Sequence, residues 1–273
     1  MADPPRRRAL NETLIPDGLD ATIALLRHGE SAWIVEGRFQ GQGDSPLTDL
    51  GQRQGAAVAA RLANPGRPPP LPIPPGLPAT IIHSPLARTT ATAALVADAL
   101  AAAHVGPPTV PRADAGLLEI GQGEWEGLLG AEIAARWPEV LAGWRQDPLG
   151  AWAPGGESLP DVDGRVRGLL STLLRGLAEG RAPGTSNRSQ VLGYLDVGGG
   201  VPWALLVGHD GVFKVVLLAL LDLPLARFWT FPFALGGLTI VEIQGGRARL
   251  RAHNLVDHLA ELESGWARPP GAL

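Results

Sequence analysis

Short apolar runs alternate with longer stretches of helical character along most of this chain. Three runs have the length and composition of buried strands: 21–26, 80–83 and 203–207. Each is followed by a stretch with the spacing of a helix: 50–62, 86–103 and 212–221. Because strands that alternate with helices run in the same direction, this order predicts a three-layer α/β/α fold with a mostly parallel central sheet.

The sequence after residue 130 adds further elements to this fold. We expect helices over 130–144 and 159–177 that form a lid over one end of the sheet. The runs 238–243 and 247–253 predict a β-hairpin that turns at the glycine pair 245–246. The chain therefore combines a parallel sheet with helical insertions and an antiparallel edge.

The remaining segments set the expected domain boundaries. Residues 1–20 form a flexible N-terminal tail and residues 266–273 a C-terminal tail, on either side of one domain at 21–265. Within this domain, 130–202 is the lid and insertion region, and its polar, glycine-rich part 180–202 is expected to be a mobile excursion.

Composition narrows the class of protein. The net charge of −4 gives no basic field for nucleic acid, and the absence of cysteine excludes disulfides and thiol catalysis. Arg6-Arg7-Arg8 is not followed by the apolar region of a secretory signal, and charged residues interrupt the apolar stretch 212–225. We expect a cytoplasmic protein with no nucleic acid or membrane partner, and the sequence is compatible with a homodimer.

The most informative residues follow the first predicted strand. His28 lies between Arg27 and Gly29. A neutral imidazole is a good nucleophile, a guanidinium offers a fork of donors to phosphate oxygens, and glycine lets the backbone approach an anion. Arg88 comes soon after the second predicted strand and His209 directly after the third. Because the carboxyl ends of parallel strands meet at one edge, these segments are expected to converge on a crevice suited to phosphoryl transfer.

Four motifs appear in a fixed order along the chain. They are Leu26-Arg27-His28-Gly29-Glu30-Ser31, Ser84-Pro85-Leu86-Ala87-Arg88-Thr89-Thr90, Leu118-Glu119-Ile120-Gly121-Gln122-Gly123-Glu124-Trp125-Glu126-Gly127 and Val207-Gly208-His209-Asp210-Gly211. In this order and spacing the set resembles the histidine phosphatase superfamily, also called phosphoglycerate mutase-like. The matching blocks extend from about residue 21 to 243.

The resemblance implies a role for each motif residue. His28 is the nucleophile and carries a phosphohistidine intermediate. Glu119 matches the proton donor of the phosphatase branch, with Glu124 and Glu126 as competitors in the same segment. The implied catalytic set is His28, Glu119, Arg27, Arg88 and His209. The implied substrate-binding set is Arg27, Arg88, His209, Ser31, Gln40, Gly41 and Asp210.

Two positions depart from the pattern of the family. Many relatives have asparagine where this chain has Ile34, which removes one polar contact to phosphate. Relatives usually have glycine after the second histidine, where this chain has Asp210. A carboxylate that points inward there would repel a phosphate dianion.

The leading interpretation is a metal-independent phosphomonoesterase that acts on a small phosphorylated metabolite and needs no cofactor. One alternative is a cofactor-dependent phosphoglycerate mutase. Its branch usually has Glu-Arg-His-Tyr-Gly at the acid position, whereas Glu119 is followed here by Ile-Gly-Gln-Gly. The other alternative is a non-catalytic module that binds phosphoesters, which the two departures favour and the intact His28 and Glu119 oppose. The substrate itself is not readable from the sequence.

Overall fold

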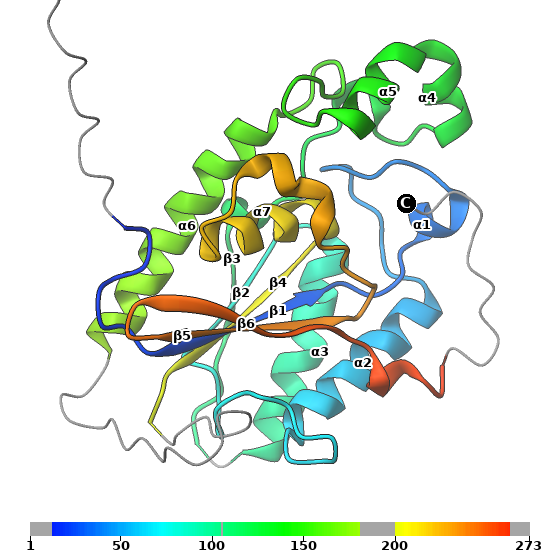
Figure 1. The fold of residues 1–273 in the computed structure, drawn as a ribbon. Helices are drawn as coiled ribbons and strands as arrows, with labels where there is room; N and C mark the ends of the chain where they lie inside the picture. Colours follow the sequence, from blue (N-terminus) through cyan, green and yellow to red (C-terminus); the bar gives the residue numbers. More distant parts are fainter. Residues whose placement is uncertain (1–12, 105, 181–199, 263–273) are drawn as a thin grey trace, which may run out of the picture.

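A single six-stranded sheet forms the centre of the protein (Figure 1). The structure, a computed structural model, describes residues 13–104, 106–180 and 200–262. The strands are β1 (Ala21–Arg27), β2 (Thr80–His83), β3 (Pro111–Ala113), β4 (Trp203–Gly208), β5 (Leu238–Gln244) and β6 (Arg247–Leu255). Their order is β3-β2-β4-β1-β5-β6. The first four are parallel, β5 is antiparallel to β1, and β6 is antiparallel to β5. The predicted mostly parallel sheet is confirmed, and so is the hairpin at its edge.

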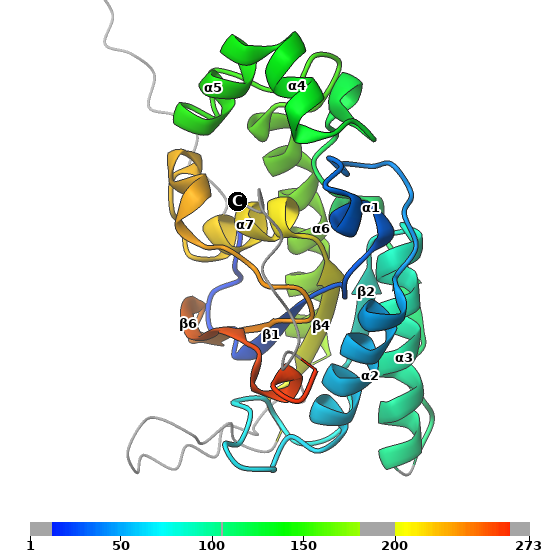
Figure 2. The ribbon, with the colours of Figure 1, turned by 90° about the vertical axis from the view of Figure 1, so that its right-hand side faces the viewer.

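Helices cover both faces of the sheet and one of its ends (Figure 2). They are α1 (Ala32–Glu36), α2 (Asp49–Ala63), α3 (Ala87–Ala103), α4 (Gly130–Arg136), α5 (Pro138–Gln146), α6 (Leu159–Glu179) and α7 (Asp210–Leu220). Side chains of β1 alternate between the two faces. Ala24 and Leu26 pack in the core with α2 and α3, whereas Ile23 and Leu25 pack in the core with α6 and α7. The three-layer arrangement is therefore confirmed.

The predicted lid is only partly a lid. The long helix α6 packs against α7, and its buried leucines share a core with Ile23 and Leu25 of β1, so α6 belongs to a layer of the fold. Of the helices in the predicted lid region, α4 and α5 lie over the carboxyl end of the sheet (Figure 1). They replace the single helix predicted over 130–144. Pro138 begins α5 and disfavours helical backbone at Trp137, which separates the two.

Other differences concern short or tightly packed segments. The sequence did not predict the three-residue strand β3 or the five-residue helix α1. Residues 13–20, assigned to the flexible tail, pack on the body: Leu19 is 2% exposed, and Leu14 and Ile15 contact the core. Most of the predicted excursion, 181–199, and the C-terminal tail lie outside the described residues. Within the described parts of the chain, no helix is long and apolar enough to cross a membrane.

A glycine pair lets α2 approach the loop that follows β1. A Cβ added to Gly29 would lie 2.3 Å from the carbonyl oxygen of Gly51, and one added to Gly51 would lie 1.9 Å from that of Glu30. Thr48 caps α2 by accepting from the N–H of Gly51 and donates to the Glu30 carboxylate at 2.7 Å. Gly29, expected to give room to an anion, therefore gives room to a helix.

We predict that Gly51→Ala lowers the free energy of unfolding by about 1–3 kcal/mol, because a rigid carbonyl group meets the new methyl group. Gly164→Ala is the matched control on α6, where an added Cβ meets nothing within 4 Å. The control should stabilise the protein by about 0.5–1 kcal/mol, the usual gain for Gly→Ala inside a helix. Denaturant unfolding of both variants checks this, and equal effects would contradict the close contact.

Candidate active site

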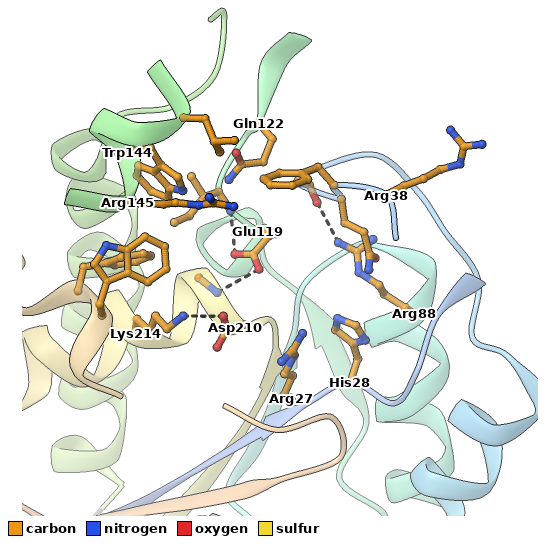
Figure 3. A pocket seen from close by; sticks show the side chains of 18 residues that line it. Arg27, His28, Arg38, Arg88, Glu119, Gln122, Trp144, Arg145, Asp210 and Lys214 are labelled. Atoms are coloured by element: carbon orange, nitrogen blue, oxygen red, sulfur yellow. Dashed lines mark hydrogen bonds and ion pairs between the residues drawn. The ribbon is translucent and has the colours of Figure 1, made fainter. Parts of the chain in front are cut away.

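The carboxyl ends of β1, β2 and β4 open into a cavity of about 260 Å³ (Figure 3). His28 directly follows β1, and its backbone N–H donates to the carbonyl oxygen of Gly208 at 3.1 Å. Arg88 lies in the first turn of α3, the helix after β2, and His209 directly follows β4. The structure thus brings together three segments that are far apart in the sequence.

Hydrogen bonding fixes the protonation of the His28 ring. The ring is 2% exposed, and its Nδ1 lies 2.6 Å from the carbonyl oxygen of Gly29. A carbonyl only accepts, so Nδ1 carries the proton and Nε2 keeps its lone pair. Burial lowers the pKa of His28 well below its ordinary value, and the positive charges of Arg88 and Arg27 lower it further. The ring is therefore neutral at neutral pH and nucleophilic at Nε2.

His209 has the opposite arrangement of donor and acceptor. Arg88 donates from Nε to Nδ1 of His209 at 3.2 Å, so the proton of this ring lies on Nε2. Nε2 is buried and has no partner among the described residues. Burial lowers the pKa of His209 well below its ordinary value, and His28 and Arg88 add to the effect. The rings of His28 and His209 pack edge to face, with their centroids 5.1 Å apart. The two neighbouring rings thus offer one acceptor, Nε2 of His28, and one donor, Nε2 of His209.

Two guanidinium groups line the same end of the cavity. Arg88 is 1% exposed and donates to the carbonyl oxygens of Gly43 and Gly41, both at 2.9 Å. Arg27 donates to the carbonyl oxygen of Phe233. Because all these partners are uncharged, both groups keep their positive charge for an anion.

Glu119 lies on the opposite wall, at the N-terminus of α7 (Figure 3). Its Oε1 accepts from the N–H groups of Ile120 and Val212, both at 2.9 Å, and its Oε2 accepts from Gly211 at 3.0 Å. These bonds point the carboxylate into the cavity and leave Oε2 with spare acceptor capacity. The competitors Glu124 and Glu126 do not line the cavity.

The predicted substrate-binding residues divide into two groups. Arg27, Arg88, Gln40, Gly41 and Asp210 line the cavity, whereas His209 lies outside the lining, in contact with His28 and Arg88. Ser31 does not line it but lies behind Gln40, donating to its Oε1 at 3.1 Å. Ile34 is also outside the lining, so the residue at this position makes no contact with the cavity.

Sequence reasoning missed the far end of the cavity. Its walls come from the lid helix α5, from α7 and from the 3-10 helix η3 (Leu225–Thr230). The missed lining residues there are Leu141, Trp144, Arg145, Lys214, Phe228 and Trp229. None belongs to a motif, although Lys214 four residues after Asp210 is the spacing of a helical ion pair.

The arrangement supplies what phosphoryl transfer needs: a neutral nucleophile, donors for phosphate oxygens and a carboxyl group for the leaving oxygen. Among the described residues, no three histidine, cysteine or acidic side chains are grouped so that they could hold a metal ion.

Comparisons with known proteins agree with this geometry. Residues 23–182 and 196–256 match the histidine phosphatase superfamily (branch 1). The chain is 34% identical over 217 residues to a glucosyl-3-phosphoglycerate phosphatase of Mycobacterium tuberculosis, covering 79% of this chain and 80% of the relative. It is 26% identical over 239 residues to phosphoserine phosphatase 1 of Hydrogenobacter thermophilus, covering 88% and 94%.

A solved structure shows the same fold. The complex of a mycobacterial glucosyl-3-phosphoglycerate phosphatase with inorganic phosphate superposes with a TM-score of 0.67 at 28% identity, covering 88% of this chain and all of that one. With the family match over most of its length, this chain belongs to the histidine phosphatase superfamily, branch 1.

Proposed function

We propose that this protein is a metal-independent phosphomonoesterase that works through a phosphohistidine at His28. The observation that carries the proposal is the His28 ring, neutral and with its Nε2 lone pair free beside Arg27 and Arg88. Phosphorylated metabolites are charged and do not cross membranes unaided, so we place this activity in the cytoplasm.

The reaction divides into two steps. In the first, Nε2 of His28 attacks phosphorus, the bond from phosphorus to the ester oxygen breaks, and Glu119 gives its proton to the departing alkoxide. In the second, Glu119 takes a proton from water, the hydroxide oxygen attacks phosphorus, and the P–N bond breaks to release inorganic phosphate. Arg27, Arg88 and His209 donate to the phosphoryl oxygens throughout.

A mutase is the second candidate, because the chain is also 33% identical over 177 residues to a probable phosphoglycerate mutase of Yersinia pestis. That match covers 63% of this chain and 72% of the relative. The residues after Glu119 differ from those of the mutase branch, and we therefore favour hydrolysis.

The first experiment separates these functions. Purified protein in excess EDTA, without bisphosphoglycerate, should release inorganic phosphate from p-nitrophenyl phosphate. His28→Ala should lose activity by at least about a thousandfold while keeping its fold, since the nucleophile is gone. Labelled substrate should leave phosphate on His28 of the wild-type protein. Interconversion of 2- and 3-phosphoglycerate with little phosphate release would favour the mutase, and a need for a divalent ion would contradict the metal-independent mechanism.

The role of Glu119 as the acid can be tested by changing the leaving group of the substrate. Glu119→Gln keeps the shape of the side chain but has no carboxylic proton to give. Hydrolysis of an alkyl phosphate should fall by about 10²–10⁴, whereas nitrophenyl phosphate, whose leaving group needs no proton, should be hydrolysed nearly as before. Glu124→Gln is the control. A leaving-group dependence in that variant alone would show that Glu119 is not the acid.

The far end of the cavity indicates the kind of leaving group. In the part of the chain that the structure describes, five cationic side chains and two carboxylates line the cavity. Arg27 and Arg88 lie at the end of the cavity beside His28, which we call the phosphoryl end. Arg38 pairs with Glu36, and Lys214 pairs with Asp210. Arg145 has no partner among the described residues, and Figure 3 shows it reaching from α5 across the cavity above Glu119. We propose that the substrate carries a second anionic group that meets Arg145.

Phosphoserine and glucosyl-3-phosphoglycerate, named in the relatives, are therefore the first substrates to test. Arg145→Met should raise KM for such carboxylate-bearing esters by about fivefold, the effect of losing one exposed ion pair of about 1 kcal/mol. KM for p-nitrophenyl phosphate should stay within about twofold, since that ester has no second anion. The control is Arg136→Met on the neighbouring helix α4, which does not line the cavity. Equal KM changes for both ester types would contradict the assignment.

A further inference from the structure

Asp210 lines the cavity, and its carboxylate has two partners. It is the first residue of α7 and directly follows His209. Its Oδ2 accepts from Nζ of Lys214 at 2.6 Å, and its Oδ1 accepts from the backbone N–H of Phe233 at 3.0 Å. The carboxylate therefore joins α7 to the segment that precedes β5.

Phe233 in turn holds Arg27. Its carbonyl oxygen accepts from Nη1 of Arg27, while the N–H of the same peptide group, that of Ala234, donates to Asn254 at 2.6 Å. Among the described residues, Phe233 is the only hydrogen-bond partner of the Arg27 guanidinium, whose Nε is buried without one. The direction of the guanidinium thus depends on a carbonyl group that Asp210 and Asn254 hold in place.

Lys214 removes the electrostatic cost of placing Asp210 there. An unpaired carboxylate on the wall of a phosphate site would repel the dianion. The Lys214 side chain is only 6% exposed, so water screens its pair with Asp210 little. Its Nζ also lies 5.0 Å and 5.3 Å from the ring centroids of Trp229 and Phe228, whose faces attract a cation. The ammonium group, from the only lysine of the chain, is thus fixed beside the carboxylate.

We propose that Asp210 and Lys214 form a positioning pair for Arg27. Asp210 anchors the backbone that aims Arg27 at the phosphoryl group, and Lys214 cancels the charge of Asp210 so that the anchor does not repel phosphate. The pair is a charged link whose net charge is zero. This inference rests on the proposed function only in that it assumes phosphate binds at Arg27.

The test is a double-mutant cycle on the dissociation constant of inorganic phosphate, measured by calorimetry. Lys214→Met should raise this constant by about tenfold or more, because Asp210 is left uncompensated. Adding Asp210→Asn to that variant should recover most of the loss, since an amide oxygen still accepts from Phe233 but carries no charge. Lys214→Arg should bind nearly as the wild type does. The matched control is Arg167→Met, which breaks an exposed pair with Asp163 of the same i,i+4 spacing on α6 and should leave phosphate binding unchanged.

The proposal is overturned if Lys214→Met binds phosphate like the wild type, or if the double variant binds no better than Lys214→Met alone. Should Lys214→Met not fold, Asp210→Gly and Asp210→Asn together test the anchor, because both variants remove the charge and only asparagine keeps an acceptor for the N–H of Phe233. Weaker phosphate binding by the glycine variant than by the asparagine variant supports the anchor, and equal binding overturns it. Because binding is measured without turnover, the two proposals fail separately. A protein that shows this coupling but hydrolyses no ester contradicts only the proposed function, and an active esterase without the coupling contradicts only the pair.

Discussion

The guanidinium of Arg88 donates hydrogen bonds to separate parts of the chain at once. It reaches the loop carbonyls of Gly41 and Gly43, and it reaches Nδ1 of His209 beyond β4. The last bond decides which nitrogen of His209 carries the proton, and the charge of Arg88 helps to keep both histidine rings neutral. A single buried cation therefore fixes the shape of one wall and the tautomer of His209, and it adds to the burial that keeps His28 neutral.

Local patterns were enough to predict most of the fold. The sequence predicts the helix over 86–103 and the strand over 80–83 almost to the residue, because Pro85 separates a short β-branched run from an alanine-rich stretch. Short elements such as β3 were not predicted, since a strand of three residues that begins with Pro111 has no periodicity to detect. The role of α6 was mistaken for a different reason: its sequence shows one apolar stripe, but not which partner that stripe meets.

The candidate site also has a part that the sequence predicts and a part that it does not. Residues of the phosphoryl end lie at strand ends within short motifs, so sequence and topology together bring them to one crevice. The far end is built from α5 and η3, whose place above the sheet follows from tertiary packing. Arg145 there carries no sequence mark that separates it from other surface arginines, and only the folded structure places it in the lining of the cavity (Figure 3).

The partner of the His28 ring has a consequence for the lifetime of the phosphorylated enzyme. In the proposed mechanism phosphorus is bound to Nε2 and a proton to Nδ1, so the ring carries a positive charge. A carboxylate at Nδ1 would stabilise that charge, but the acceptor here is the neutral carbonyl of Gly29, and Arg27 and Arg88 oppose the charge from nearby. The electrostatic environment thus destabilises the proposed phosphohistidine. Such a site favours rapid transfer to water over holding the group for a later acceptor.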